Sequence, residues 1–381
     1  MKVMKNRIGI NLLGVLPSIG GAYNYVKNFL DLLSKYDTLN EYFLFLPNNH
    51  IELNVDQTNF VKIVCEVNTN NRYKRIIYEN FKLPFLCRKN KIDFMIWPID
   101  TIAFFTNTKN IVISHDFLPI ISPKQFSFIK RTYLGFMLKN TTRKADYFFF
   151  ISKTTESEFK SLNLRKKYKS IIFPNSINYH FITDIEKSKI DDFKSKYNLT
   201  NPYWIYVAHN YPHKNHIKLI LAFSGFKRKQ KTNVKLILRG DNLEFNDKIK
   251  SIVNELELND SIVFLPKLSF KDLPLLYNSA DALVFPSLYE GGGIPLMEAQ
   301  ACGCPIMASN ISAVLEFCEN SSYNFDPNSV DSIIETMSFF YLLDKSTKMK
   351  KVEFGIKNTK ELRPDFLVNR LLYAYEELLE T

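Results

Sequence analysis

The chain has 381 residues, of which 46% are hydrophobic and 23% are charged. This composition excludes collagen-like and disordered chains, and the length predicts two domains at roughly 150 residues each. Five scattered cysteines are too few for a disulfide framework and favour a reducing, cytoplasmic compartment. The first residues lack a signal-peptide layout, and no run reaches the roughly 18 apolar residues of a membrane helix. We therefore expect a cytoplasmic protein that could touch a membrane only peripherally.

Positive charge is concentrated in the first half of the chain. Residues 1–180 hold 26 Lys and Arg against 13 Asp and Glu, whereas residues 181–381 hold 24 against 26. A basic half suits a nucleic acid, an anionic membrane surface or an acidic substrate. A lysine-rich, solvated surface without such a partner is an equally good interpretation. We expect no nucleic acid partner, because the chain has no motif of the usual modules and no aromatic-basic interleaving typical of RNA-binding sheets.

Short apolar runs alternate with longer amphipathic stretches through the first half, which predicts strand-helix units around a parallel sheet. The first unit has a strand at 7–13, a turn at Gly20-Gly21 and then an amphipathic helix. Further strands are expected at 42–46, 61–67, 94–97, 110–114, 147–152 and 170–174. Their continuous apolar character indicates burial on both faces.

A polar stretch without periodicity ends at Asn201-Pro202, and we expect an interdomain linker there. A second alternating series follows, with strands at 203–208, 234–238, 262–265, 282–286 and 305–308. The predicted fold is α/β, with two doubly wound Rossmann-like domains facing a central cleft. The predicted boundaries are a domain at 1–178, a linker at 179–202, a domain at 203–361, and a C-terminal helix at about 362–381 for which packing back on the first domain is one option.

The most informative stretch follows the predicted strand 282–286. Gly291 to Gly293 and then Pro295 predict a flexible loop that leads directly into a helix. The start of this helix presents unpaired backbone N–H groups and a positive dipole, which suits a phosphate. Glu290 lies on the loop and Glu298 in the helix, and either carboxylate can accept hydrogen bonds from sugar hydroxyls. From the pattern alone, a loop-capping glutamate and a solvated helical glutamate are the simpler interpretation.

This stretch resembles the signature of retaining GT-B glycosyltransferases of the family-4 type, the group 1 glycosyltransferases, in which two glutamates eight positions apart flank a glycine-rich loop and a helix. The resemblance implies that Glu290 contacts the donor sugar and that Glu298 binds the nucleotide ribose. It also implies that backbone groups around the loop hold the donor; the residues are Gly291, Gly292, Gly293, Ile294, Pro295 and Leu296. Gly292 departs from the family pattern, since many relatives carry an aromatic residue there.

A second matching segment is Tyr206-Val-Ala-His-Asn-Tyr-Pro-His-Lys-Asn215, a predicted strand that runs through a polar loop into a helix. A lysine there can neutralise a leaving diphosphate without a metal ion. The segment is similar to the family's Val-Gly-Arg strand end followed by Lys-Asn or Lys-Gly, so Lys214 takes the phosphate-binding position. His209 replaces the family's arginine and supplies a hydrogen bond without a fixed charge. Arg239, after the next strand, is expected to assist Lys214 in donor binding.

Three motifs of the first half also resemble the family. Gly20-Gly21 follows the first strand, where the family's glycine-rich loop lies over the donor phosphate. His115-Asp116 matches a His-Asp pair whose histidine lies by the donor sugar, and we place Asp116 on the acceptor side. Ser152-Lys153 is similar to the family's strand end that lines the acceptor side. A plain tight turn and structural side chains are the alternatives at these positions.

Three histidines, His209, His213 and His216, raise the alternative of a metal site. Their spacing does not put three imidazoles on one helical face, because His209 belongs to a strand end. Cys302 and Cys304 have no second cysteine pair at zinc-site spacing and are interpreted as packing residues. The sequence has no Asp-x-Asp triplet, which argues against the metal-dependent GT-A type. We therefore expect no cofactor and no metal requirement.

Taken together, the resemblance implies a retaining, metal-independent glycosyltransferase of surface polysaccharide or lipopolysaccharide biosynthesis, with Glu290, Lys214 and His115 as its catalytic residues. The implied donor is GDP-mannose or a similar nucleotide-sugar, and the implied acceptor is a glycan or a polyprenyl-diphosphate-linked glycan. The basic first half suits such an acceptor at the cytoplasmic face of an anionic inner membrane. The alternatives are another GT-B enzyme, such as a sugar-nucleotide epimerase or a glycogen-type synthase, and, more remotely, a nucleic-acid-binding protein.

Overall fold

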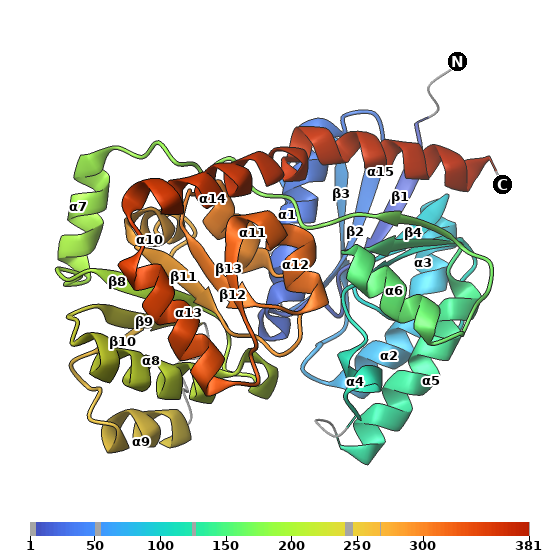
Figure 1. Ribbon diagram of the computed structural model, residues 1–381. Helices are drawn as coiled ribbons and strands as arrows, with labels where there is room; N and C mark the ends of the chain where they lie inside the picture. Colours follow the sequence, from blue (N-terminus) through green and yellow to red (C-terminus); the bar gives the residue numbers. More distant parts are fainter. Residues whose placement is uncertain (1–4, 50–54, 124–126, 241–246, 267, 381) are drawn as a thin grey trace. The chain divides into compact units, whose positions relative to one another are not determined.

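The computed structural model describes residues 5–49, 55–123, 127–240, 247–266 and 268–380. The chain divides into two compact units: the first runs to Ser176 and resumes at Pro364, and the second spans Ile177–Arg363. Each unit is built on a parallel β-sheet with helices packed around it (Figure 1). The expected α/β architecture of two doubly wound domains is confirmed.

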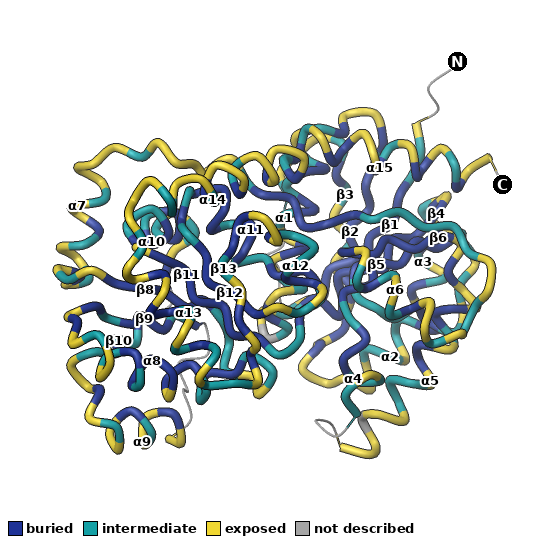
Figure 2. Tube along the Cα trace, viewed as in Figure 1, coloured by how far each residue is buried: buried dark blue, intermediate teal, exposed yellow. Residues whose placement is uncertain are grey.

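The sheet of the first unit has seven parallel strands in the order β3-β2-β1-β4-β5-β6-β7. Its strands are β1 (Arg7–Asn11), β2 (Glu41–Pro47), β3 (Phe60–Cys65), β4 (Phe94–Trp97), β5 (Lys109–Ser114), β6 (Tyr147–Phe150) and β7 (Lys169–Ile172). Each falls within or beside a predicted apolar run. The central strands are almost entirely buried because helices cover both faces of the sheet (Figure 2).

The helices of the first unit include one from the far end of the chain. They are α1 (Gly21–Tyr36), α2 (Arg72–Phe81), α3 (Leu83–Lys89), α4 (Leu118–Ile121), α5 (Phe128–Lys144), α6 (Lys153–Ser161) and α15 (Pro364–Leu379). Helix α15 packs on this unit, since Tyr147 donates a 2.7 Å hydrogen bond to Glu377 and the rings of Phe94 and Tyr375 lie 5.0 Å apart. Within the described residues, no helix combines the length and apolar content of a membrane-spanning segment.

The sheet of the second unit has six parallel strands in the order β10-β9-β8-β11-β12-β13. They are β8 (Tyr203–Val207), β9 (Lys235–Arg239), β10 (Ile262–Leu265), β11 (Ala282–Phe285), β12 (Ile306–Ser309) and β13 (Ser322–Phe325). The edge strand β13 was not among the predicted strands. Its four residues alternate Ser and Asn with aromatic side chains and form no apolar run.

Residues 179–202, expected as a linker, belong to the second unit. They contain helix α7 (Lys187–Lys196), and Phe181, Phe193 and Leu199 are buried in the core of that unit. The segment is mostly polar, and its three buried apolar side chains are too widely spaced to form a recognisable periodic pattern. These side chains pack the segment against the second unit. The other helices of the unit are α8 (His216–Gln230), α9 (Asp247–Glu255), α10 (Leu273–Ser279), α11 (Ile294–Ala301), α12 (Ser312–Cys318), α13 (Val330–Leu342) and α14 (Lys345–Asn358).

Candidate functional site

The strand order of the second sheet reverses between β8 and β11. The segment that follows β8 leads to β9 on one side, and the segment that follows β11 leads to β12 on the other side. Ligands of doubly wound sheets bind between two such segments, at the carboxyl ends of the strands. The segment after β8 carries Lys214, and the segment after β11 carries Glu290. Sheet topology thus brings together two predicted catalytic residues that are 76 positions apart.

Lys214 and Glu290 form an ion pair. Lys214 Nζ lies 2.6 Å from Glu290 Oε1, and their side chains are only 18% and 8% exposed. A charge-assisted hydrogen bond of this length between shielded groups is stronger than an exposed pair. The two opposite charges neutralise each other at a place where both side chains are shielded from bulk water.

Backbone and side-chain bonds hold the lysine segment in place. A short 3₁₀ turn spans Pro212–Lys214. Asn215 follows it, adopts a φ of 61° and is the N-cap of helix α8. The Asn215 amide donates to the carbonyl oxygens of Pro286 and Pro327 at 3.0 and 2.8 Å. Tyr206 donates a 2.6 Å hydrogen bond to the carbonyl of Lys214. The segment after β8 is therefore tied to those that follow β11 and β13.

The glycine-rich loop leads into helix α11, as predicted. Gly293 caps the helix with a φ of 61°, and a Cβ at this position would lie 2.8 Å from Leu296 Cδ1. Glycine is required because other residues rarely adopt this left-handed conformation. Pro295 occupies the first turn of the helix, and Leu296 is completely buried. The loop thus presents helix N–H groups beside Glu290, an arrangement that suits an anion.

Glu298, one turn into α11, lies in a polar cluster with residues from two other elements. Tyr277 of α10 donates a 2.9 Å hydrogen bond to Glu298 Oε2. Burial raises the pKa of Glu298 to about 7, while the Tyr277 hydrogen bond and the charge of Arg239, at the end of β9, act to lower it. A carboxyl with such a raised pKa changes its charge near neutral pH.

The histidines of the segment after β8 lie beside aromatic rings. Tyr211 stacks on His213 with the ring centroids 5.7 Å apart, and its ring lies 5.9 Å from that of His209. Burial, with a contribution from the Lys214 charge, lowers the pKa of His213 to about 4 and that of His216 to about 3. Across the part of the chain that the structure describes, no group of three or more His, Cys, Asp or Glu side chains could hold a metal ion.

In the first unit, Gly20 caps helix α1 with a φ of 62°, and Gly21 is its first residue. A Cβ on Gly21 would meet no atom within 4 Å, so open space lies beside this helix start. One turn later, Tyr25 donates a 2.9 Å hydrogen bond to the carbonyl of Phe173. The Tyr25 ring meets the His115 ring edge-on, with centroids 4.9 Å apart. Two of the predicted motifs are therefore neighbours.

His115 follows β5 and is almost completely buried. Its Nε2 lies 2.8 Å from the carbonyl oxygen of Pro98, so this nitrogen carries the proton. Its backbone N–H donates to Asp100 Oδ1 at 2.7 Å. Burial lowers the pKa of His115 and raises that of Asp100 to about 7. Asp116, expected on the acceptor side, accepts a 3.0 Å hydrogen bond from the N–H of Leu118 at the start of α4.

Ser152 and Lys153 open helix α6. Ser152 is completely buried, and its hydroxyl accepts a 3.0 Å hydrogen bond from the N–H of Thr155, so it is the N-cap of the helix. Lys153 is the first helical residue and is exposed. Capping explains why serine stands at position 152, and the acceptor-side role of both residues stays a prediction.

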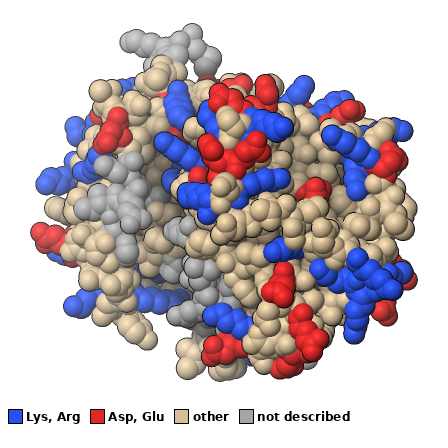
Figure 3. All heavy atoms as spheres, turned by 90° about the vertical axis from the view of Figure 1, so that its left-hand side faces the viewer, with Lys and Arg blue, Asp and Glu red and all other residues tan. Residues whose placement is uncertain are grey.

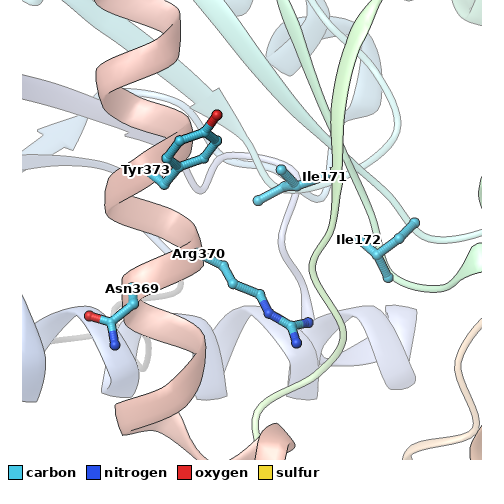
Figure 4. Close-up of a pocket in the computed structure, with 5 residues that line it drawn as sticks. All are labelled: Ile171, Ile172, Asn369, Arg370 and Tyr373. Atoms are coloured by element: carbon cyan, nitrogen blue, oxygen red, sulfur yellow. The ribbon is translucent and has the colours of Figure 1, made fainter.

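A pocket of the first unit lies between helix α15 and the edge strand β7 (Figure 4). Asn369, Arg370 and Tyr373 of the helix and Ile171 and Ile172 of the strand line it. None of the predicted site residues belongs to this pocket.

Sequence reasoning missed two polar partners of the predicted residues, Tyr277 and Asp100. Tyr277 lies in the apolar helix α10, and nothing in its local sequence distinguishes it from a core tyrosine. Asp100 follows strand β4, and a carboxylate shortly after a predicted strand is a signal that could have identified it.

Residues 187–355 match the model of the family described as glycosyl transferases group 1. The O-antigen chain mannosyltransferase RfbU of Salmonella typhimurium is 32% identical over 215 residues, which cover 56% of this chain and 56% of that protein. O-antigen chain mannosyltransferase B of Escherichia coli is 33% identical over 176 residues, 46% of each chain. The chain thus spans about half the length of the curated relatives it matches.

Among solved structures, the sucrose-phosphate synthase of Thermosynechococcus elongatus is similar, with a TM-score of 0.79 and 17% identity over 99% of this chain and 100% of that one. At this identity the similarity shows the fold, which is GT-B. The resemblance to the group 1 glycosyltransferases is therefore confirmed by the family match over residues 187–355.

Proposed function

We propose, on the premise that residues 187–355 form a group 1 glycosyltransferase domain, that this protein transfers a sugar from a nucleotide-sugar to a glycan or polyprenyl-diphosphate-linked acceptor. The proposed pathway is the assembly of a surface polysaccharide of the O-antigen type, and the proposed donor is GDP-mannose. The names of the relatives support the pathway and mannose as the sugar, since two of them are O-antigen chain mannosyltransferases.

The observation that carries the proposal is the contact between Lys214 and Glu290 beside the glycine-rich start of α11. A departing nucleoside diphosphate gains negative charge, which a lysine ammonium and helix N–H groups stabilise. A carboxylate accepts hydrogen bonds from sugar hydroxyls. One site therefore combines a cation and N–H donors for the diphosphate with an acceptor for the sugar.

The proposed reaction retains the configuration of the anomeric carbon. The bond from the anomeric carbon to the diphosphate oxygen breaks, and its electron pair leaves with the diphosphate. The acceptor hydroxyl attacks the same face of the sugar and passes its proton to the departing phosphate oxygen. Lys214 and the start of α11 stabilise the leaving group, and Glu290 fixes the sugar. No covalent nucleophile and no metal ion take part.

Glu298 is the proposed contact to the ribose hydroxyls, with Arg239 and His209 on the nucleotide side. The ionised carboxylate accepts two hydroxyl donors, whereas the protonated form is a weaker acceptor. Because the pKa of Glu298 is about 7, nucleotide affinity should fall as the pH drops below neutrality. In the first unit, His115 is proposed to contact the donor sugar, Gly20-Gly21 the donor phosphate, and Ser152, Lys153 and Asp116 the acceptor.

The proposed site can be tested by measuring how far GDP-, UDP-, ADP- and dTDP-sugars raise the unfolding temperature of the full chain in the presence of a chelator. We expect one nucleotide to stabilise the wild type and to stabilise neither Lys214→Ala nor Glu298→Ala. Lys218→Ala is the matched control, since Lys218 is on α8 and donates an exposed 2.8 Å hydrogen bond to the carbonyl of Asn328. Equal stabilisation of the wild type and all three variants would overturn the assignment of the binding residues. Binding that occurs only after metal is added would overturn the proposed metal independence.

Retention is tested separately, by NMR of the anomeric proton in the product formed from the identified donor and a glycan acceptor. An unchanged anomeric configuration supports the proposed same-face attack. An inverted product contradicts the mechanism but leaves the assignment of the donor intact.

A further inference from the structure

Three helices of the first unit present large apolar side chains to solvent. On α2, Tyr73, Ile77 and Phe81 recur every four residues and form one exposed stripe, with Tyr73 79% exposed. Phe85 on α3 is also exposed. On α5, Phe128, Ile129 and Phe136 are exposed, with Ile129 at 81%. Large apolar side chains that gather on a protein surface mark a site of interaction.

The exposed groups of these helices are connected. Helices α2 and α5 lie side by side (Figure 1), and the guanidinium of Arg72 sits 4.3 Å from the centre of the Tyr133 ring. Exposed Phe105 packs on Phe81 with ring centroids 5.4 Å apart. Its neighbour Phe104 packs on Phe136 at the same distance. We name the outward side chains of α2, α3 and α5, together with Phe105, the apolar-basic face.

The charge of this face has one sign. Residues 72–89 contain six Lys and Arg, and residues 128–144 contain five, against one acidic residue in the two segments together, Glu79. Glu79 is largely shielded and lies next to Arg75 and Asn11. Several of the cations are exposed, among them Lys74, Lys139 and Arg143. By contrast, the face of the second unit that Figure 3 shows carries acidic and basic side chains intermixed.

From this combination of exposed apolar side chains with a large excess of cations, we propose that the apolar-basic face docks on the surface of an anionic lipid bilayer. Amphipathic helices bind at such an interface through aromatic and aliphatic side chains that enter the headgroup region and cations that contact lipid phosphates. Long lysine and arginine side chains reach the phosphates while their methylene stems stay in apolar surroundings.

The charge and the apolar side chains of this face together favour a bilayer over other partners. A second copy of the chain placed on this face would bring the same cations against each other, which disfavours a symmetric dimer. A nucleic acid would satisfy the cations, but it would leave aliphatic groups such as Ile77 and Ile129 without an apolar partner. The bilayer satisfies both. The inference does not depend on sugar transfer, and its test needs no donor or acceptor.

The test measures co-sedimentation of the full chain with vesicles of phosphatidylcholine and phosphatidylglycerol, mixed at roughly three to one, and with vesicles of phosphatidylcholine alone. We expect binding to the anionic vesicles that weakens as the salt concentration rises. Lys74→Gln with Lys139→Gln should lower the affinity about 25-fold, since each interfacial cation contributes about fivefold. Ile77→Ser with Ile129→Ser should lower it about tenfold or more.

Matched controls lie on the second unit. Lys248→Gln with Lys250→Gln removes two exposed cations from α9, and Phe339→Ser with Leu342→Ser removes two exposed apolar side chains from α13. Both controls should bind as the wild type does, and circular dichroism should show all variants folded. Failure of the wild type to bind, or equal losses in variants and controls, would overturn the proposal. Tighter binding to a DNA fragment than to vesicles, lost in the lysine variant, would assign the face to nucleic acid instead.

Discussion

Lys214 Nζ lies 2.6 Å from Glu290 Oε1, and this ion pair joins the segments that leave two neighbouring strands of the second sheet. Both side chains are shielded from water, so each depends on the other for neutralisation. The pair sits where the strand order reverses and beside the start of α11. A ligand with a diphosphate would compete with Glu290 for the lysine, which links ligand binding to the packing of both segments.

The first prediction concerns the stability of this pair. Lys214→Met leaves the Glu290 carboxylate shielded and without its cation, and we expect a loss of about 3 kcal/mol in the free energy of unfolding. The double variant Lys214→Met with Glu290→Gln should recover most of this loss, because no charge remains unpaired. Urea denaturation measures both, and Lys218→Met should cost about 0.5 kcal/mol or less. A double variant no more stable than Lys214→Met would contradict this account.

The second prediction is a pH dependence that arises from Glu298. Its pKa is raised from 4.5 to about 7 by burial, so between these values the native state holds a proton that the unfolded chain has released. The free energy of unfolding therefore decreases as the pH rises through this window. Glu298→Gln removes this contribution, and relative to the wild type it should gain about 3 kcal/mol between pH 4.5 and pH 7.

Denaturation of the two proteins at a series of pH values measures this difference, and the contributions of other titrating groups cancel in the comparison. Tyr277→Phe is the complementary variant. The Tyr277 hydroxyl lowers the pKa of Glu298, so its removal should move the midpoint of the transition to higher pH. Parallel stability curves for wild type and Glu298→Gln would show that the carboxyl is ionised throughout.

A third prediction compares two substitutions of glycine by alanine. Gly293 has a φ of 61°, and a Cβ there would press on Leu296, so Gly293→Ala should destabilise the protein by about 1 kcal/mol or more. Gly135 lies inside helix α5, where a Cβ meets nothing within 4 Å. Gly135→Ala should therefore stabilise the protein by about 0.5–1 kcal/mol. Thermal unfolding measures the stability of both variants. An equal loss of stability in the two variants would mean that the left-handed conformation of Gly293 does not cause the loss in Gly293→Ala.

A fourth prediction tests the proton position on His115. Its Nε2 donates to the carbonyl of Pro98, and the amide nitrogen of a glutamine can occupy a similar position, whereas that of asparagine falls short. His115→Gln should thus be about 1 kcal/mol more stable than His115→Asn. Urea denaturation of the two variants gives the difference. Equal stability would indicate that the Pro98 bond contributes nothing.

The sequence by itself determined most of the local structure. Apolar runs identified twelve of the strands, because strands buried on both faces need apolar residues at successive positions. Glycines followed by a proline predicted the loop and the start of α11, because these residues restrict the backbone locally. The two-glutamate motif led to the group 1 family, which the match over residues 187–355 confirms.

Contacts between distant residues were decided only by the tertiary structure. The pairing of Lys214 with Glu290 depends on the order of the strands, which no local pattern encodes. Tyr277 reaches Glu298 because α10 and α11 pack together, and burial of the resulting cluster raises the pKa of the carboxyl. Residues 364–379 return to the first unit because their apolar stripe fits beside α1. Periodicity reports which side of an element is buried, whereas its partner is selected by packing across the whole chain.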